Sequence, residues 1–175
     1  MDELDGRIPL IVDAGPTTHG IESTIIAVHE GKIDILRRGP IADEELSMFG
    51  KIDAISSVEK ISAPGQLPSH YAPKTPLRLI ENAKSISPMQ NQQVGLLAWN
   101  QIESEKHFVA VRLLSERGDL REAAANLFRC LRELDALNVD LIVAERVPEI
   151  GLGAAIMDRL LRAAYRQPDG PDKPE

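Results

Sequence analysis

The sequence predicts an α/β protein in two parts separated by a proline-rich segment. Beyond about residue 75, apolar runs alternate with amphipathic helical patterns, which is typical of a layered α/β domain with a mostly parallel sheet. The first 60 residues instead hold β-rich runs and one short helical pattern. Between them, residues 62–76 (SAPGQLPSHYAPKTP) contain four prolines, each of which fixes φ and lacks a backbone N–H. We therefore expect domains at 1–60 and 76–167, a linker at 61–75, and a polar, disordered tail at 168–175.

The elements of the first part follow from short local signals. Residues 7–15 (RIPLIVDAG) form an apolar run closed by Asp-Ala-Gly, which predicts a largely buried strand ending at a turn. Two β-rich runs at 23–29 and 32–36 are joined by Glu30-Gly31, which predicts a hairpin. Residues 41–50 have helical periodicity with an acidic first turn, and a short strand or loop follows.

The second part alternates between two periodicities. Apolar runs predict strands at 76–80, 93–99, 107–114 and 140–147, and amphipathic patterns predict helices at 119–137 and 151–166. In the first of these helices one stripe is apolar: Leu120, Ala124, Leu127, Leu131 and Leu134. The single cysteine, Cys130, lies in the same apolar helix, so we expect a buried and unreactive thiol.

Composition narrows the function classes. A net charge of −7 and an aromatic content of 3% argue against broad electrostatic binding of nucleic acid and against base-stacking platforms, although a local basic patch stays open. The chain has no apolar run of membrane-spanning length, and its acidic first residues do not resemble a signal peptide, so we expect no membrane association and a cytoplasmic location. No spacing of histidines or cysteines predicts a structural metal.

One stretch, GPTTHGIESTI at 15–25, has the composition of a small-molecule cradle. Gly15 and Gly20 allow close backbone approach, and Ser23 and Thr24 offer hydroxyls that can bind a carboxylate or a phosphate. The residues alone favour the alternative that this is a polar loop whose hydroxyls satisfy their own backbone.

Three further motifs offer candidate ligand contacts. Arg37 in ILRRGPI has the position of a phosphate-binding fork, with a surface role equally open, whereas for Arg38 a solvated surface position is favoured. His70 and Tyr71 in SHYAP are placed either to close over a ligand or to fill an interdomain contact. GLGAAIMDRLLRAA at 151–164 is a weak dinucleotide-binding signal, because its glycines are better explained by a tight strand-to-helix turn.

Four of these motifs, in this order, resemble a known family. DGRIPLIVDAGPTTHGIESTI, IDILRRGPI, APGQLPSHYAPKTPLRL and GLGAAIMDRLLRAA are similar to the second half of the two-domain threonylcarbamoyl-AMP synthases, the YrdC-type enzymes of tRNA modification. The resemblance implies a remnant of a YrdC-like twisted α/β sheet followed by a small Rossmann-like α/β/α domain. It also implies an ATP-dependent nucleotidyltransferase that converts L-threonine, bicarbonate and ATP into threonylcarbamoyl-AMP and pyrophosphate.

The resemblance implies roles for individual residues. Thr24 would bind the L-threonine substrate with Ser23 beside it, Arg37 would contact the ATP phosphates, and Tyr71 would cover the ATP side. His70 and Tyr71 together would form a linker gate over the catalytic cavity. ATP is then a substrate accompanied by Mg²⁺, and no residue of this chain is assigned a catalytic role.

Two departures from the family pattern shape the expectation for this chain. The Lys-x-Arg pair and Ser-x-Asn motif that grip the triphosphate in the family do not precede Gly15, and Arg38 stands where proline is usual. We therefore expect a C-terminal portion that is inactive alone and that self-associates through exposed strands. The alternative is a non-catalytic module that binds RNA or a protein of the tRNA-modification machinery.

Overall fold

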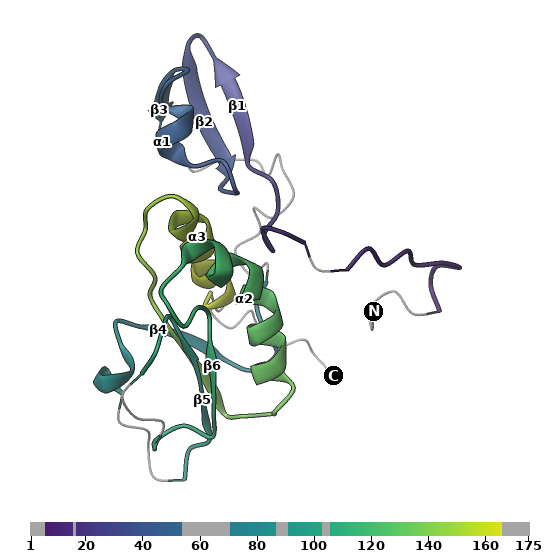
Figure 1. Ribbon diagram of the computed structural model, residues 1–175, viewed down its shortest axis with the longest axis vertical. Helices are drawn as coiled ribbons and strands as arrows, with labels where there is room; N and C mark the ends of the chain where they lie inside the picture. The colour runs from purple at the N-terminus through teal and green to yellow at the C-terminus, as the bar shows by residue number, and fades with distance from the viewer. Residues whose placement is uncertain (1–5, 16, 54–70, 87–90, 103–105, 166–175) are drawn as a thin grey trace, which may run out of the picture.

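The computed structural model describes residues 6–15, 17–53, 71–86, 91–102 and 106–165, which form two sheets (Figure 1). The predicted linker at 61–75 is described only from Tyr71 onward, and the predicted tail at 168–175 lies outside the described residues. His70 lies outside them too.

The first sheet is a hairpin with one added strand. Strands β1 (Ile25–His29) and β2 (Lys32–Arg37) are antiparallel, and β3 (Lys51–Asp53) pairs in parallel with β2. Glu30 and Gly31 have φ of 48° and 80°, and this left-handed pair fits the twist of a two-residue hairpin loop. The hairpin prediction is therefore confirmed. The helical pattern at 41–50 yields only one turn, α1 (Asp43–Leu46), where the Glu45 carboxylate accepts the Ala42 N–H at 2.9 Å.

The buried strand predicted at 7–15 is wrong. The described residues of that segment form no strand, and Leu10 and Val12 are 74% and 85% exposed. Figure 1 shows the segment running away from both sheets. An extended segment becomes a buried strand only when a neighbour accepts its backbone hydrogen bonds, and no described strand lies beside this one.

The second sheet has the parallel architecture that the sequence predicts. Its strand order is β4-β7-β5-β6, and every neighbouring pair is parallel. The strands and helices of this part are β4 (Leu77–Ile80), β5 (Val94–Ala98), β6 (Ala110–Leu113), α2 (Leu120–Asp135), β7 (Leu141–Glu145) and α3 (Leu152–Ala163). The expected fold class, a parallel Rossmann-like α/β domain after a smaller sheet, is confirmed.

The helices α2 and α3 both cover one face of this sheet. Leu97 and Ile142 point from the strands toward Leu127 and Leu134 of α2 and into the same core as α3. The opposite face packs against the 3-10 helix η1 (Ala83–Ser85) and against partly buried Ile86, Ile102 and Phe108. Within the described residues, the second helical layer of this domain is thus reduced to one short turn.

The starts of the two helices have distinct local causes. The Asp119 carboxylate caps α2 by accepting the Glu122 N–H at 2.8 Å. Before α3 the chain turns so tightly that a Cβ on Gly153 would overlap the carbonyl oxygen of Pro148. This confirms that the glycines at 151 and 153 serve a strand-to-helix turn.

The residues before β1 reach across to the second part. Gly20 has φ of 66°, and a Cβ there would overlap the backbone of Ala124 and Ala125 in α2. Ile21 and Tyr71 pack against the core that α2 and α3 share with the second sheet. The stretch 15–25 therefore packs on the second part through its middle.

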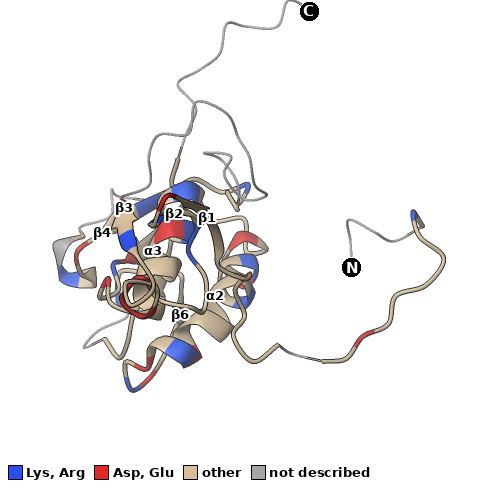
Figure 2. Ribbon diagram, turned by 90° about the horizontal axis from the view of Figure 1, so that it is seen from above, with Lys and Arg blue, Asp and Glu red and all other residues tan. Residues whose placement is uncertain are grey.

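The surface carries charges of both signs. Figure 2 shows acidic and basic residues interspersed over the described elements rather than gathered on one face. Among the described helices, none has both the length and the apolar composition that a membrane crossing requires.

Candidate functional site

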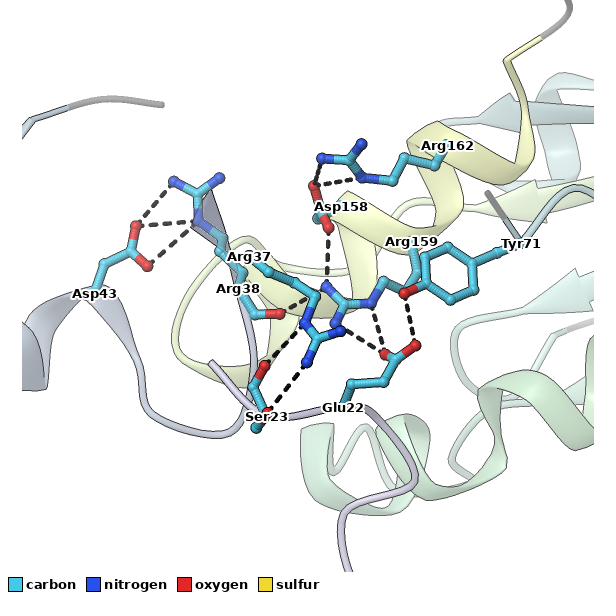
Figure 3. Close-up of polar contacts among 9 residues, drawn as sticks. All are labelled: Glu22, Ser23, Arg37, Arg38, Asp43, Tyr71, Asp158, Arg159 and Arg162. Carbon is cyan, nitrogen blue, oxygen red and sulfur yellow. Dashed lines mark hydrogen bonds and ion pairs between the residues drawn. The ribbon is translucent and has the colours of Figure 1, made fainter. Parts of the chain in front are cut away.

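A buried arginine lies where the first part meets α3 (Figure 3). The side chain of Arg159 is 0% exposed. Its guanidinium donates to the Arg38 carbonyl at 2.6 Å, to the Asp158 carboxylate at 2.9 Å, and to Glu22 Oε2 at 3.0 and 3.2 Å. A fully buried cation needs partners of this kind, because removing an ion from water without them costs roughly several kcal/mol.

Glu22 joins this arginine to the linker. Its Oε1 accepts the Tyr71 hydroxyl at 2.6 Å, while its Oε2 accepts from Arg159. Burial alone would raise the pKa of the Glu22 carboxyl, but hydrogen bonds from Tyr71, from its own backbone and from Arg159 outweigh burial and hold that pKa below its usual value. Glu22 is therefore held in its charged form at neutral pH.

Tyr71 is fixed on three sides. Its ring stacks on Phe128 of α2 with centroids 5.3 Å apart, and the Arg159 guanidinium carbon lies 5.5 Å from the ring centroid. Burial first, and then the hydrogen bond to Glu22, raise the pKa of Tyr71 to about 12. The residue also has φ of 75°, a left-handed conformation that costs about 1–2 kcal/mol for a non-glycine residue. Such strain persists only where surrounding contacts hold it, and it is often found at functional sites.

Ser23 and Arg37 lie in contact at the edge of this network. Arg37 donates from Nε to the Ser23 carbonyl at 3.0 Å and from Nη2 to the Ser23 hydroxyl at 3.1 Å. Ser23 is exposed and Arg37 is half-buried. The pair thus presents a hydroxyl beside a guanidinium, which is a combination suited to an anion.

Thr24 uses its hydroxyl within the protein. The Oγ1 donates to the Ile41 carbonyl at 3.0 Å and accepts the Ile41 N–H at 3.1 Å. This is the backbone-satisfying role that the residues alone favour. A hydroxyl has one donor and two acceptor sites, so the oxygen of Thr24 retains one acceptor site for a ligand.

Arg38 differs from its predicted surface role. Its side chain is 29% exposed and forms a two-pronged ion pair with Asp43, with Nη2 and Oδ2 separated by 2.8 Å. Arg38 is thus half-buried and paired with Asp43, so the expected solvated position holds only in part. In α3, Asp158 likewise binds Arg162 at 3.1 Å as well as Arg159.

The structure brings Ser23 and Arg37 into contact. Tyr71 lies next to them, because its hydroxyl donates to Glu22, which directly precedes Ser23 in the sequence (Figure 3). The sequence analysis did not single out Glu22, Asp158 or Arg159. Arg159 carries a signal that could have identified it, because it lies on the buried side of α3 beside Ile156, Leu160 and Ala163. A charged residue in an apolar helical stripe indicates a buried partner.

The described residues contain no group of three or more histidine, cysteine, aspartate or glutamate side chains that could hold a metal ion. The single cysteine, Cys130, is 1% exposed, and burial raises the pKa of its thiol. The expectation of a buried cysteine is confirmed.

Comparisons with known proteins agree in identifying one family. The family model described as the C-terminal domain of threonylcarbamoyl-AMP synthase matches residues 34–165. The threonylcarbamoyl-AMP synthase of Bacillus subtilis is 36% identical over 174 residues, which covers 93% of this chain and 50% of the relative. The corresponding protein of Pyrococcus abyssi is 33% identical over 184 residues, covering 94% of this chain and 52% of the relative.

Solved structures give the same result. The crystal structure of P. abyssi Sua5 complexed with L-threonine matches with a TM-score of 0.74 and 32% identity, over 91% of this chain and 50% of that one. A P. abyssi Sua5 variant with an adjacent histidine and tyrosine replaced by alanine matches with a TM-score of 0.73 and 30% identity, covering 91% of this chain and 49% of that one. The chain spans about half the length of the curated relatives it matches. The chain belongs to the threonylcarbamoyl-AMP synthase family, and it matches the C-terminal domain of these proteins.

Proposed function

We propose that this chain supplies one wall of the substrate site of a threonylcarbamoyl-AMP synthase that acts in tRNA modification. The observation that carries the proposal is the match, over 91% of the chain, to a relative whose structure was solved with L-threonine. Because the chain spans about half the length of its curated relatives, we propose that it contributes part of the site and has little activity alone.

The proposed reaction joins L-threonine, bicarbonate and ATP. The threonine amine and bicarbonate form a carbamate with loss of water, a carbamate oxygen attacks the α-phosphorus, and the bond to the bridging oxygen of pyrophosphate breaks. Positioning and charge neutralisation supply most of the rate in phosphoryl and nucleotidyl transfers of this kind. The protein must therefore hold several anionic groups close together.

Three side chains of this chain fit that task. Arg37 offers a cation for the nucleotide phosphates, and the Ser23 hydroxyl lies 3.1 Å from its Nη2. The acceptor site that Thr24 retains beside its two bonds to Ile41 suits a donor, such as the ammonium or hydroxyl group of L-threonine. We therefore propose Ser23 and Thr24 for the threonine and Arg37 for ATP.

His70 and Tyr71 are proposed as a gate on the linker at 61–75, between a catalytic part at 1–60 and an accessory domain at 76–167. Tyr71 is held by Glu22 and Phe128, so the linker is tied to the residues before β1. The Sua5 variant has an adjacent histidine and tyrosine replaced, and His70-Tyr71 is the sole His-Tyr pair in this sequence, so we propose that the two pairs correspond.

Mg²⁺ would enter this site with the nucleotide. It keeps several waters and is usually bound through substrate phosphates with one or two carboxylates, so it does not need a dedicated protein cage. The absence of a metal-binding cluster among the described residues is compatible with that arrangement. We propose the cytoplasm as the location.

Pyrophosphate release from ATP, with L-threonine and bicarbonate present, tests the proposal. The chain is assayed alone and after mixing with a separately expressed N-terminal portion of a synthase, and we expect release only from the mixture. Arg37→Ala should abolish most of that release, whereas Arg121→Ala, at an exposed arginine of α2, should not. Absence of release from both samples would contradict the proposal. A salt-dependent shift of labelled tRNA in its place would favour the non-catalytic RNA-binding module.

A further inference from the structure

The second sheet carries a cavity of about 560 Å³ that shares no residue with the arginine network. It lies at the carboxyl ends of β4, β7 and β5, where Asn82, Glu145 and Asn100 line it. Its volume falls within the roughly 300–1,000 Å³ typical of small-molecule sites.

The topology opens a crevice at this edge. The segments that follow β4 and β5 cover the sheet face opposite the helices, through Ile86 and Ile102. The chain that follows β7 turns to the other face, where α3 packs. Since β7 lies between β4 and β5, the connections diverge on both of its sides, and ligands of open α/β sheets bind where connections diverge in this way.

Glu145 holds the crevice in shape. It is 7% exposed, and its two carboxylate oxygens accept the Ala83 N–H at 2.6 Å and the Trp99 N–H at 2.9 Å. One buried side chain at the end of β7 therefore fixes the segments that leave both neighbouring strands. The backbone at Ala83 and Trp99 is therefore held in place on both sides of β7, and a fixed backbone lowers the entropic cost of binding.

The lining combines three kinds of chemistry. Half-buried Ile86, Ile102 and Phe108 provide an apolar surface that includes one aromatic ring. Exposed Asn82, Asn100 and Gln101 provide amides, each with donors and an acceptor. Lys84 and His107 add basic groups to the lining.

We infer that this cavity binds a small anion with a flat heterocyclic ring, of the mononucleotide class. Asparagine and glutamine amides match the donor–acceptor edges of nucleobases, and an apolar aromatic surface accepts the face of the ring. A lysine and a histidine beside them suit a phosphate. The site is separate from the ATP contacts proposed above, so either proposal can fail without the other.

AMP is the probe for the first experiment. Isothermal titration calorimetry measures its affinity for the chain, and amide NMR shifts locate its site. We expect the shifts to centre on Ala83, Trp99 and Gln101. Gln101→Ala and Lys84→Ala should each weaken binding roughly tenfold, because each removes a hydrogen bond or a charge contact to the ligand.

Matched substitutions elsewhere separate this site from others. Gln93→Ala and Lys51→Ala alter exposed residues outside the cavity and should leave the affinity for AMP unchanged. Arg37→Ala should also leave it unchanged if the AMP is in this cavity. Adenosine and inorganic phosphate, tested singly, should each bind more weakly than AMP.

Three results would overturn the inference. One is the absence of any shift at about 10 mM AMP, a concentration that detects even millimolar affinity. Another is a loss of AMP binding in Arg37→Ala but not in Gln101→Ala, which would place the nucleotide at the first part. The third is inorganic phosphate reproducing the full affinity of AMP, which would remove the role assigned to the ring.

Discussion

Replacing Arg159 with glutamine should release the first sheet from α3. The substitution removes all four hydrogen bonds that the guanidinium makes to Glu22, Asp158 and the Arg38 carbonyl. Glutamine is shorter, uncharged and unable to form the same fork. The Glu22 carboxylate then keeps only the Tyr71 hydroxyl among these side-chain partners.

The magnitude follows from burial. Removing one partner of a fully buried ion pair costs about 3–5 kcal/mol. Arg159 is fully buried, but the Glu22 side chain is 35% exposed, so water screens part of the loss. We expect about 3 kcal/mol, the lower end of that range, which corresponds to a roughly hundredfold rise in the opening equilibrium at the junction.

Hydrogen exchange measured by mass spectrometry follows this opening. Strands β1 and β2 form a hairpin to which β3 adds only three residues, and a hairpin alone is marginally stable, so the exchange rate of residues 25–37 should report the docking of this sheet. We expect roughly hundredfold faster exchange there in Arg159→Gln, with little change in β7 at residues 141–145. The control is Arg162→Gln, which removes an i,i+4 pair that lies within α3 and does not reach the first sheet, so it should change exchange at 25–37 less than about fivefold. Equal exchange at 25–37 in the Arg159→Gln protein and in the unsubstituted chain would refute the role of Arg159.

Four further predictions concern single residues. Tyr71→Phe keeps the ring but loses the bond to Glu22, so NMR titration should show a higher pKa for that carboxyl, and denaturation should show a loss of about 1–2 kcal/mol. Because the pKa of Glu22 is lower in the folded state, the carboxylate contributes to the free energy of unfolding above pH 4.5, and this contribution is lost as the pH falls through the folded-state pKa. Glu22→Gln should therefore flatten that part of a curve of stability against pH. Gly20→Ala should cost about 3 kcal/mol, from left-handed backbone strain plus overlap with α2, whereas Gly15→Ala, with open space around it, should cost about 1 kcal/mol in thermal denaturation. Cys130 should react with a thiol reagent only after unfolding, and rapid labelling of the native chain would contradict its burial.

The second sheet could be predicted because its signals are local. Strand β5 is wholly apolar, β7 is apolar up to its last residue, and α2 repeats its apolar residues along one face. The hairpin at Glu30-Gly31 is equally local, since the turn residues themselves accept left-handed backbone conformations. The strand prediction at 7–15 was wrong for the opposite reason. The composition of that segment suits a strand, but burial depends on a neighbouring strand that composition cannot supply.

The candidate site was predicted only in part for a related reason. Ser23, Arg37 and Tyr71 stand in motifs that are recognisable by themselves, and the structure places all three around one network. Glu22 and Arg159 are 137 residues apart in the sequence, and neither side chain indicates the other. Their pairing is a property of the assembled core, where α3 brings a charged side chain under the stretch that precedes β1.

The contact between Arg159 and the Arg38 carbonyl does not depend on which side chain stands at position 38. Arg159 donates a hydrogen bond to the backbone oxygen of residue 38 and not to its side chain. Every amino acid, proline included, has that oxygen. The family resemblance implies proline at this position, where this chain has arginine. Exchange between the two alters the pair with Asp43 but keeps the acceptor that Arg159 requires. A proline at position 38 would therefore lose the ion pair with Asp43 and keep the backbone contact with α3.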